Sequence, residues 1–110
     1  MRLSRFGLIV ASAGTLLLAC PPAAAAPHSY TVVMDKLKFG PLPAQLHKGD
    51  TIIWVNKDMF RHTATATDHH SFDVDLMPGK AAKMVLNKTG TFPFICRYHP
   101  GMRGTLTVEK

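Results

Sequence analysis

The chain has 110 residues, a formal net charge of +6 and a hydrophobic content of 46%. This length suits one small domain and no more. The 13 basic residues are scattered, with no basic run and no interleaved aromatics, so the composition argues against a nucleic-acid partner. A mild positive field either steers the protein toward an acidic surface or only keeps it soluble.

The first 26 residues predict a secretory signal peptide. Two arginines lie in residues 1–5, residues 6–19 form a short apolar run, and small residues lead to Ala26. The run is shorter than the roughly 20 residues of a membrane-spanning helix, which argues against an uncleaved anchor. We therefore expect export to the periplasm and a folded domain at residues 27–110. Alternatively, the sequence Leu-Leu-Ala-Cys ending at Cys20 resembles a bacterial lipoprotein box, and the protein would then be lipid-anchored through Cys20.

From residue 30 onward the sequence predicts short strands separated by turns, without helical periodicity. Thr51–Asn56 carries the strongest strand signal, because it is rich in β-branched and aromatic residues. The predicted strands are 30–34, 45–47, 51–56, 62–67, 71–75, 81–86, 91–96 and 104–109. Seven or eight strands at this spacing predict an all-β Greek-key β-sandwich. The side chains expected in its core are Trp54, Phe92, Phe94, Ile95, Leu106 and Val108.

A cluster of candidate metal ligands lies in the segment Cys96–Met102. The other cysteine belongs to the predicted signal region, so Cys96 stands unpaired in an oxidising compartment, where a free thiol is prone to oxidation. Ligation to a metal would protect its sulfur. Cys96, His99 and Met102, joined by His62 from a distant strand, supply the thiolate, two imidazoles and thioether of a mononuclear copper electron-transfer site. The turn residues between His99 and Met102 favour their convergence.

Other interpretations of these residues are weaker. One Cys and two His would leave the fourth position of a zinc site to Met, which is a poor zinc ligand. A catalytic Cys–His pair lacks an evident Asn or Asp that orients the His. If the residues were only structural, Cys96 would be a buried core cysteine and Met102 a gap filler.

Five further residues near these segments invite a hypothesis. The hydroxyl of Thr63, directly after the first ligand, is expected to tie the two ligand-bearing segments together. His28 lies near the predicted new N-terminus, His47 at a strand edge, and His69 and His70 in a polar loop. Each of these histidines is assigned a surface position, with at most an assisting role in copper loading.

These motifs resemble those of the cupredoxins, and within them the group of amicyanin, plastocyanin and pseudoazurin. The resemblance rests on Gly49–Asn56, His62-Thr63, Gly90–Cys96 and the closing Cys-x-x-His-Pro-x-Met-Arg-Gly pattern that starts at Cys96. Two residues between the last His and Met match the short amicyanin-like loop. The resemblance implies one type 1 copper per chain, with His62, Cys96, His99 and Met102 as ligands. Arg61 departs from the Pro that amicyanin-like chains usually carry there.

The resemblance also implies a function, a periplasmic one-electron carrier that cycles between Cu(I) and Cu(II). Such a carrier is not an enzyme, has no small-molecule substrate and is expected to be monomeric. It would dock transiently with a dehydrogenase, cytochrome or oxidase through an apolar patch at His99, lined by Met59, Phe60 and Pro100. The alternative is a copper-delivery or copper-resistance protein, in which Met59 and Met77 assist transfer of the metal.

Overall fold

The computed structural model describes residue 7, residues 9–16 and residues 26–110. The predicted signal peptide, including Cys20, falls mostly outside these described residues. Within them, no helix has the length and apolar character that crossing a membrane would require.

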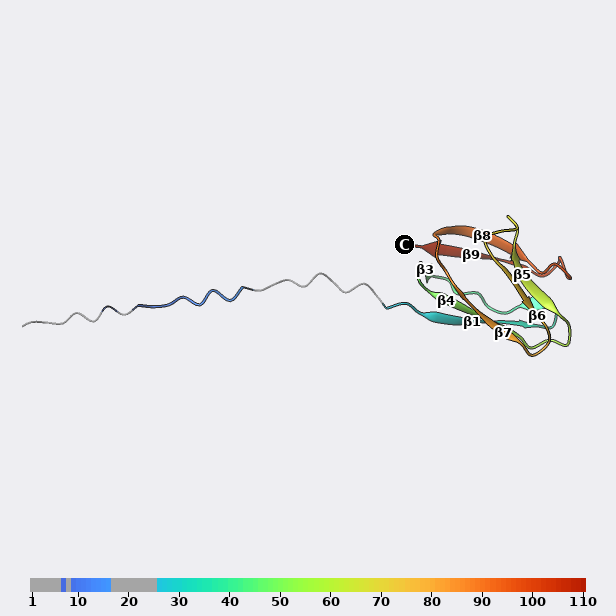
Figure 1. Ribbon diagram of the computed structural model, residues 1–110, viewed down its shortest axis with the longest axis horizontal. Coiled ribbons are helices and arrows are strands. Elements are labelled where there is room, and N and C mark those ends of the chain that lie inside the picture. The colour runs from blue at the N-terminus through green and yellow to red at the C-terminus, as the bar shows by residue number, and fades with distance from the viewer. Residues whose placement is uncertain (1–6, 8, 17–25) are drawn as a thin grey trace, which may run out of the picture.

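In the part of the chain that the structure describes, nine strands form two sheets. The two sheets pack against each other (Figure 1). The four-stranded sheet has the order β2-β1-β4-β7, and the five-stranded sheet has the order β3-β9-β8-β5-β6. Neighbours such as β4 and β7, or β5 and β8, are distant in sequence, so the chain crosses repeatedly between the sheets, as Greek-key connections do. The predicted all-β sandwich is confirmed. The strands are β1 (Ser29–Asp35), β2 (Lys38–Phe39), β3 (Leu46–His47), β4 (Thr51–Asn56), β5 (His62–Ala66), β6 (Asp73–Leu76), β7 (Ala81–Val85), β8 (Gly90–Ile95) and β9 (Arg103–Glu109).

One strand more is present than the sequence analysis expected. β2 is a two-residue strand that pairs antiparallel with the end of β1. The turn between them is formed by Lys36 and Leu37, which both have positive φ, 52° and 58°. Hairpin turns of this kind usually carry Asn or Gly, and the lack of those residues hid the hairpin.

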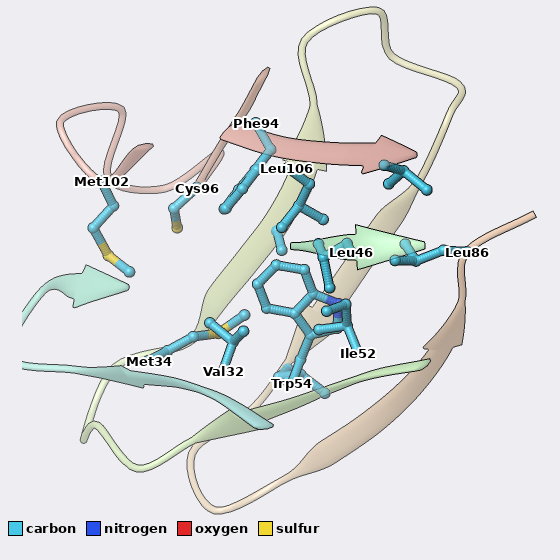
Figure 2. Close-up of a cluster of buried hydrophobic side chains, with 13 residues drawn as sticks. Val32, Met34, Leu46, Ile52, Trp54, Leu86, Phe94, Cys96, Met102 and Leu106 are labelled. Carbon is cyan, nitrogen blue, oxygen red and sulfur yellow. The ribbon is translucent and has the colours of Figure 1, made fainter. Parts of the chain in front are cut away.

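The core lies between the two sheets (Figure 2). Trp54 and Phe94 are fully buried and their rings meet edge to face at 5.4 Å, while Leu106 and Val108 of β9 also point inward. Two expected core residues differ from the prediction. Phe92 is only partly buried against the cluster, and Ile95 is partly exposed on the outer face. Because side chains alternate along a strand, the inward position of Phe94 sends Ile95 outward.

The strand order brings three chain segments to one end of the sandwich. β8 lies between β5 and β9 and runs antiparallel to both, with Thr65 opposite Ile95 and Ile95 opposite Arg103. The start of β5, the end of β8 and the start of β9 therefore share one end of the five-stranded sheet. We call this end the ligand pole.

Candidate metal centre

Two predicted ligands from distant segments are in contact at the ligand pole. His62 opens β5 and Cys96 directly follows β8, and both are fully buried. The Nδ1 atom of His62 lies 3.7 Å from the Sγ atom of Cys96, although the residues are 34 positions apart. The register of β5 against β8 produces this contact.

The other ring nitrogen of His62 faces a carboxylate. Its Nε2 lies 2.8 Å from Oδ2 of Asp58, whose side chain is 8% exposed. An ionised carboxylate can only accept a hydrogen bond, so Nε2 carries the proton and Nδ1 presents its lone pair toward the sulfur. The hydrogen bond from His62, followed by those from the backbone N–H groups of Leu37 and Met59, lowers the pKa of Asp58 to about 2. Asp58 therefore fixes the tautomer in which Nδ1 can bind a metal.

The segment after Cys96 folds back on itself. The amide of Met102 donates to the carbonyl of His99 at 2.8 Å, and the amide of Cys96 donates to the carbonyl of Met102 at 2.9 Å. These bonds close the turn through Pro100 and Gly101 as the sequence analysis expected. The buried side chain of Met102 and that of Cys96 lie at the same end of the core cluster (Figure 2).

The rings of the two predicted histidine ligands also meet at the pole. The ring centroids of His62 and His99 are 5.0 Å apart, and the ring of Phe60 lies 5.8 Å from His99. Unlike His62, His99 is partly exposed. Among the residues that the structure describes, no three side chains of His, Cys, Asp and Glu form a ready-made metal cluster. The direct donor contact is the pair His62 and Cys96, with His99 packed against the first of them.

The separation within that pair suits a shared metal ion. Metal–nitrogen and metal–sulfur bonds of about 2.0 and 2.3 Å, opened to a trigonal angle, place the two donor atoms about 3.7 Å apart. The atoms of His62 and Cys96 have this separation. A thiolate, two imidazoles and a thioether also form the soft, mixed donor set that suits copper better than zinc or calcium.

Thr63 has the role that the sequence analysis gave it. Its hydroxyl accepts a 2.9 Å hydrogen bond from the amide of Arg97, which joins β5 to the segment that follows Cys96. Its own amide points at the Cys96 sulfur at 3.3 Å. A hydrogen bond from an amide stabilises a thiolate, so Thr63 both ties the segments together and supports the charge on sulfur.

The four other predicted surface histidines lie away from the ligand pole. His28 and His47 lie beside the start of β4, where their backbone amides both donate to the side chain of Asp50. His69 and His70 follow the far end of β5 in an exposed loop. The surface assignments of all four are confirmed.

The role of Asp58 was not predicted from the sequence. The loop from residue 57 to 61 was expected to be only a connection. Asn56, which is fully buried, shapes it by donating to the carbonyls of Phe60 and Leu76 and by accepting from the amide of Asp58. A carboxylate four residues before a predicted His ligand was the available signal, but only the folded loop turns it toward the ring.

The chain matches the cupredoxin-like domain family over residues 8–108. It is 31% identical to plastocyanin from Prochlorothrix hollandica, and the alignment covers 93% of this chain and 88% of that protein. It is also similar to the solved structure of an amicyanin variant in the Cu(I) form, with 25% identity and a TM-score of 0.60 over 74% of this chain and 82% of that one.

A third similarity is to part of an enzyme. The Cu-containing nitrite reductase from Thermus scotoductus SA-01 shares 29% identity with this chain and superposes with a TM-score of 0.68. The alignment covers 79% of this chain but only 24% of the reductase. The chain therefore corresponds to about a quarter of that enzyme's length.

Proposed function

The chain belongs to the cupredoxin family, of the amicyanin and plastocyanin type, and from this membership we propose that it is an exported one-electron carrier with a single type 1 copper site. Blue copper electron transfer is the general function of this group. The observation that carries the proposal for this chain is the contact of His62 Nδ1 with Cys96 Sγ, made between segments 34 residues apart.

The proposed ligands are His62, Cys96, His99 and Met102. When bound there, copper would supply one-electron chemistry between Cu(I) and Cu(II), which two imidazoles, a thiolate and a weakly binding thioether would accommodate in both states. Three of the four side chains are buried, so the fold excludes water from most of the site. Because the donors belong to strand ends and a hydrogen-bonded turn, little rearrangement is needed between the two oxidation states.

Electrons would enter or leave at His99, the proposed ligand that is partly exposed. Phe60 lies against its ring and is partly exposed, Met59 precedes Phe60 and is exposed, and the exposed Tyr98 directly precedes His99. A small apolar surface of this kind fits brief docking to a redox protein such as a dehydrogenase, cytochrome or oxidase. In this proposal the chain acts as a monomer and carries out no substrate chemistry of its own.

We also propose that residues 1–26 direct export to the periplasm and that residues 27–110 are the mature domain. The pattern of basic, apolar and small residues supports this division. The alternative, a lipid anchor at Cys20, would retain that residue in the mature protein. The mass of the purified mature protein distinguishes the two.

A copper-delivery role remains the second candidate, because two methionines near the ligand pole are exposed. Met59 is 79% exposed and Met77, directly after β6, is 54% exposed. Thioethers at the surface can pass Cu(I) between proteins. A carrier keeps its copper through repeated reduction and oxidation, whereas a delivery protein releases Cu(I) to an acceptor.

The test of the carrier proposal is the colour of the copper-loaded protein. We expect an intense blue absorption that bleaches on one-electron reduction and returns on oxidation without loss of metal. The substitution Cys96→Ser should abolish the band, while His47→Asn, at the opposite end of the sandwich, should retain it. Replacing Met102 by Leu should keep copper bound but shift the reduction potential. A blue band in Cys96→Ser would refute the ligand assignment.

A further inference from the structure

Two threonine side chains on the outer face of β5 are buried, which is unusual for the solvent side of a sheet. Ala64 between them faces the core, so Thr63 and Thr65 point to the outer face, yet they are 0% and 4% exposed. The same face of the neighbouring strand β6 presents Asp75 opposite Thr63 and Asp73 opposite Thr65. A polar layer therefore lies outside the sheet, next to the ligand pole.

The hydroxyls in this layer form a directed chain of hydrogen bonds. The Thr65 hydroxyl lies 2.7 Å from a carboxylate oxygen of Asp73 and 2.9 Å from the Thr63 hydroxyl. An ionised carboxylate only accepts, so the single hydrogen of Thr65 goes to Asp73 and that of Thr63 goes to Thr65. The Thr63 oxygen is then free to accept from the amide of Arg97, 2.9 Å away. Asp73 thus orients the group that holds the residue after Cys96.

Two arginines cover this layer and connect it to the ligand segments. The Arg97 side chain lies 3.3 Å from the Thr65 hydroxyl, 3.2 Å from Asp73 and 3.6 Å from Asp75. Arg61, the residue before His62, binds both oxygens of Asp75 at 2.8 and 2.6 Å. Its guanidinium also stacks over the ring of Tyr98 at 5.1 Å. One aspartate of β6 is therefore shared by arginines from both ligand-bearing segments.

The consequence of this network is local. Ion pairs that are partly exposed add little to the stability of a whole domain, but bidentate geometry and a shared network hold the side chains in defined positions. Here the positions that are held are those of Arg61 and Arg97, each directly adjacent in sequence to a predicted ligand. The network therefore acts on where the ligand loop sits.

We propose that Asp73 and Asp75 are positioning residues that clamp the loop Cys96–Met102 onto β5. They act through Arg97, through Arg61 and through the two threonine hydroxyls, and they hold the loop in place before any metal binds. The significance of the clamp for copper rests on the proposed function, whereas its effect on the loop does not.

The test is amide hydrogen exchange in the metal-free protein, followed residue by residue. We expect the double variant Asp73→Asn/Asp75→Asn to exchange the Arg97 amide roughly tenfold faster than the wild type, with faster exchange also at Met102. Amides in the core of β4 should not change. The copper-loaded double variant should also release its metal to a chelator roughly tenfold faster.

Asp68→Asn is the matched control, because Asp68 is an acidic residue between the same two strands but bonds only within its own loop, to His70 and Ser71. It should leave exchange of the Arg97 amide unchanged. The proposal would be overturned if the Arg97 amide of the double variant exchanged at the wild-type rate. It would also be overturned if Asp68→Asn accelerated that exchange equally. The exchange measurement needs no metal, so a failure of the copper function would not alter its result.

Discussion

At the scale of single residues, the ligand pole depends on side chains with a partner on each side. His62 has one ring nitrogen toward the Cys96 sulfur and the other toward Asp58, and Cys96 also accepts from the amide of Thr63. The side chains of His62, Cys96 and Asp58 cannot rotate without losing one of these contacts. The donor atoms are therefore preorganised by hydrogen bonding as well as by packing.

Asp58 should lower the reduction potential of the site. Its carboxylate accepts the Nε2 proton of His62, which makes Nδ1 a more basic ligand and favours Cu(II) over Cu(I). We expect Asp58→Asn to raise the reduction potential and to weaken Cu(II) binding by about tenfold or more. Redox titration and competition with a Cu(II) chelator measure the two effects.

Asp35→Asn is the control for Asp58→Asn. Each variant removes a carboxylate that accepts from an amide in the turn between β1 and β2. Asp35 is half-buried and accepts only from the amide of its neighbour Lys36. If both variants shifted the potential equally, the effect would be one of general charge, and the specific role of the bond to His62 would be wrong.

At the scale of elements, a single carboxylate joins three strands at the end opposite the ligand pole. Asp50 is 2% exposed and precedes β4 directly. It accepts from the amide of His28 before β1, at 2.9 Å, and from the amide of His47 in β3, at 2.8 Å. These backbone hydrogen bonds, that of His28 first, hold the pKa of Asp50 below its usual range.

The lowered pKa makes stability depend on pH in a defined direction. Asp50 stabilises the fold fully above about pH 4, the ordinary aspartate value, and this contribution is lost as the pH falls toward the lowered folded pKa. We expect Asp50→Asn to reduce the free energy of unfolding by about 2 kcal/mol at pH 7, and by less at low pH. Urea unfolding at both pH values measures this. Glu109→Gln, at an exposed position, should show no such difference, and a pH-independent loss in Asp50→Asn would contradict the argument.

Strands were predictable from the sequence wherever local composition decided them. Thr51–Asn56 forms β4 with the expected bounds, because β-branched and aromatic residues fill the whole segment. The strand expected at 71–75 is instead β6 at 73–76. Asp68 accepts from the amides of His70 and Ser71 and so extends the turn. The competing side-chain hydrogen bond, invisible in the periodicity, moved the boundary.

The ligand candidates could be predicted from the sequence, whereas the arginine and aspartate pairs beside them could not. Cys96, His99 and Met102 lie within seven positions, so their spacing is local information. The partners of Arg61 and Arg97 are on β6, and only the pairing of β5 with β6 brings them together. Such pairing is decided by the whole fold, so the clamp could not be read from the sequence.

At the scale of the whole molecule, the ligand pole is also a point where the two sheets are joined. The buried side-chain amide of Asn56, at the end of β4, donates to the carbonyl of Leu76 in β6, and the backbone carbonyl of Asn56 accepts from the amide of Gly79. The loop that starts after Asn56 carries Asp58 to His62. Both sheets therefore support the proposed ligands, although the ligands themselves belong to segments of the five-stranded sheet.

Copper should for this reason stabilise the entire domain and not only a loop. Its proposed donors come from the start of β5 and from the segment between β8 and β9, so unfolding of the sandwich must separate them. A ligand at 100 times its dissociation constant adds about 2.7 kcal/mol to the folded state, which raises Tm by about 10 °C or more in a domain of this size. We expect calorimetry to show this rise for the wild type and a much smaller one for Cys96→Ser.

The double variant His69→Asn/His70→Asn should keep the full rise, because those side chains lie in the exposed loop beyond the far end of β5. If that variant lost the rise while Cys96→Ser kept it, the stabilising metal would be bound at the surface histidines and not at the ligand pole.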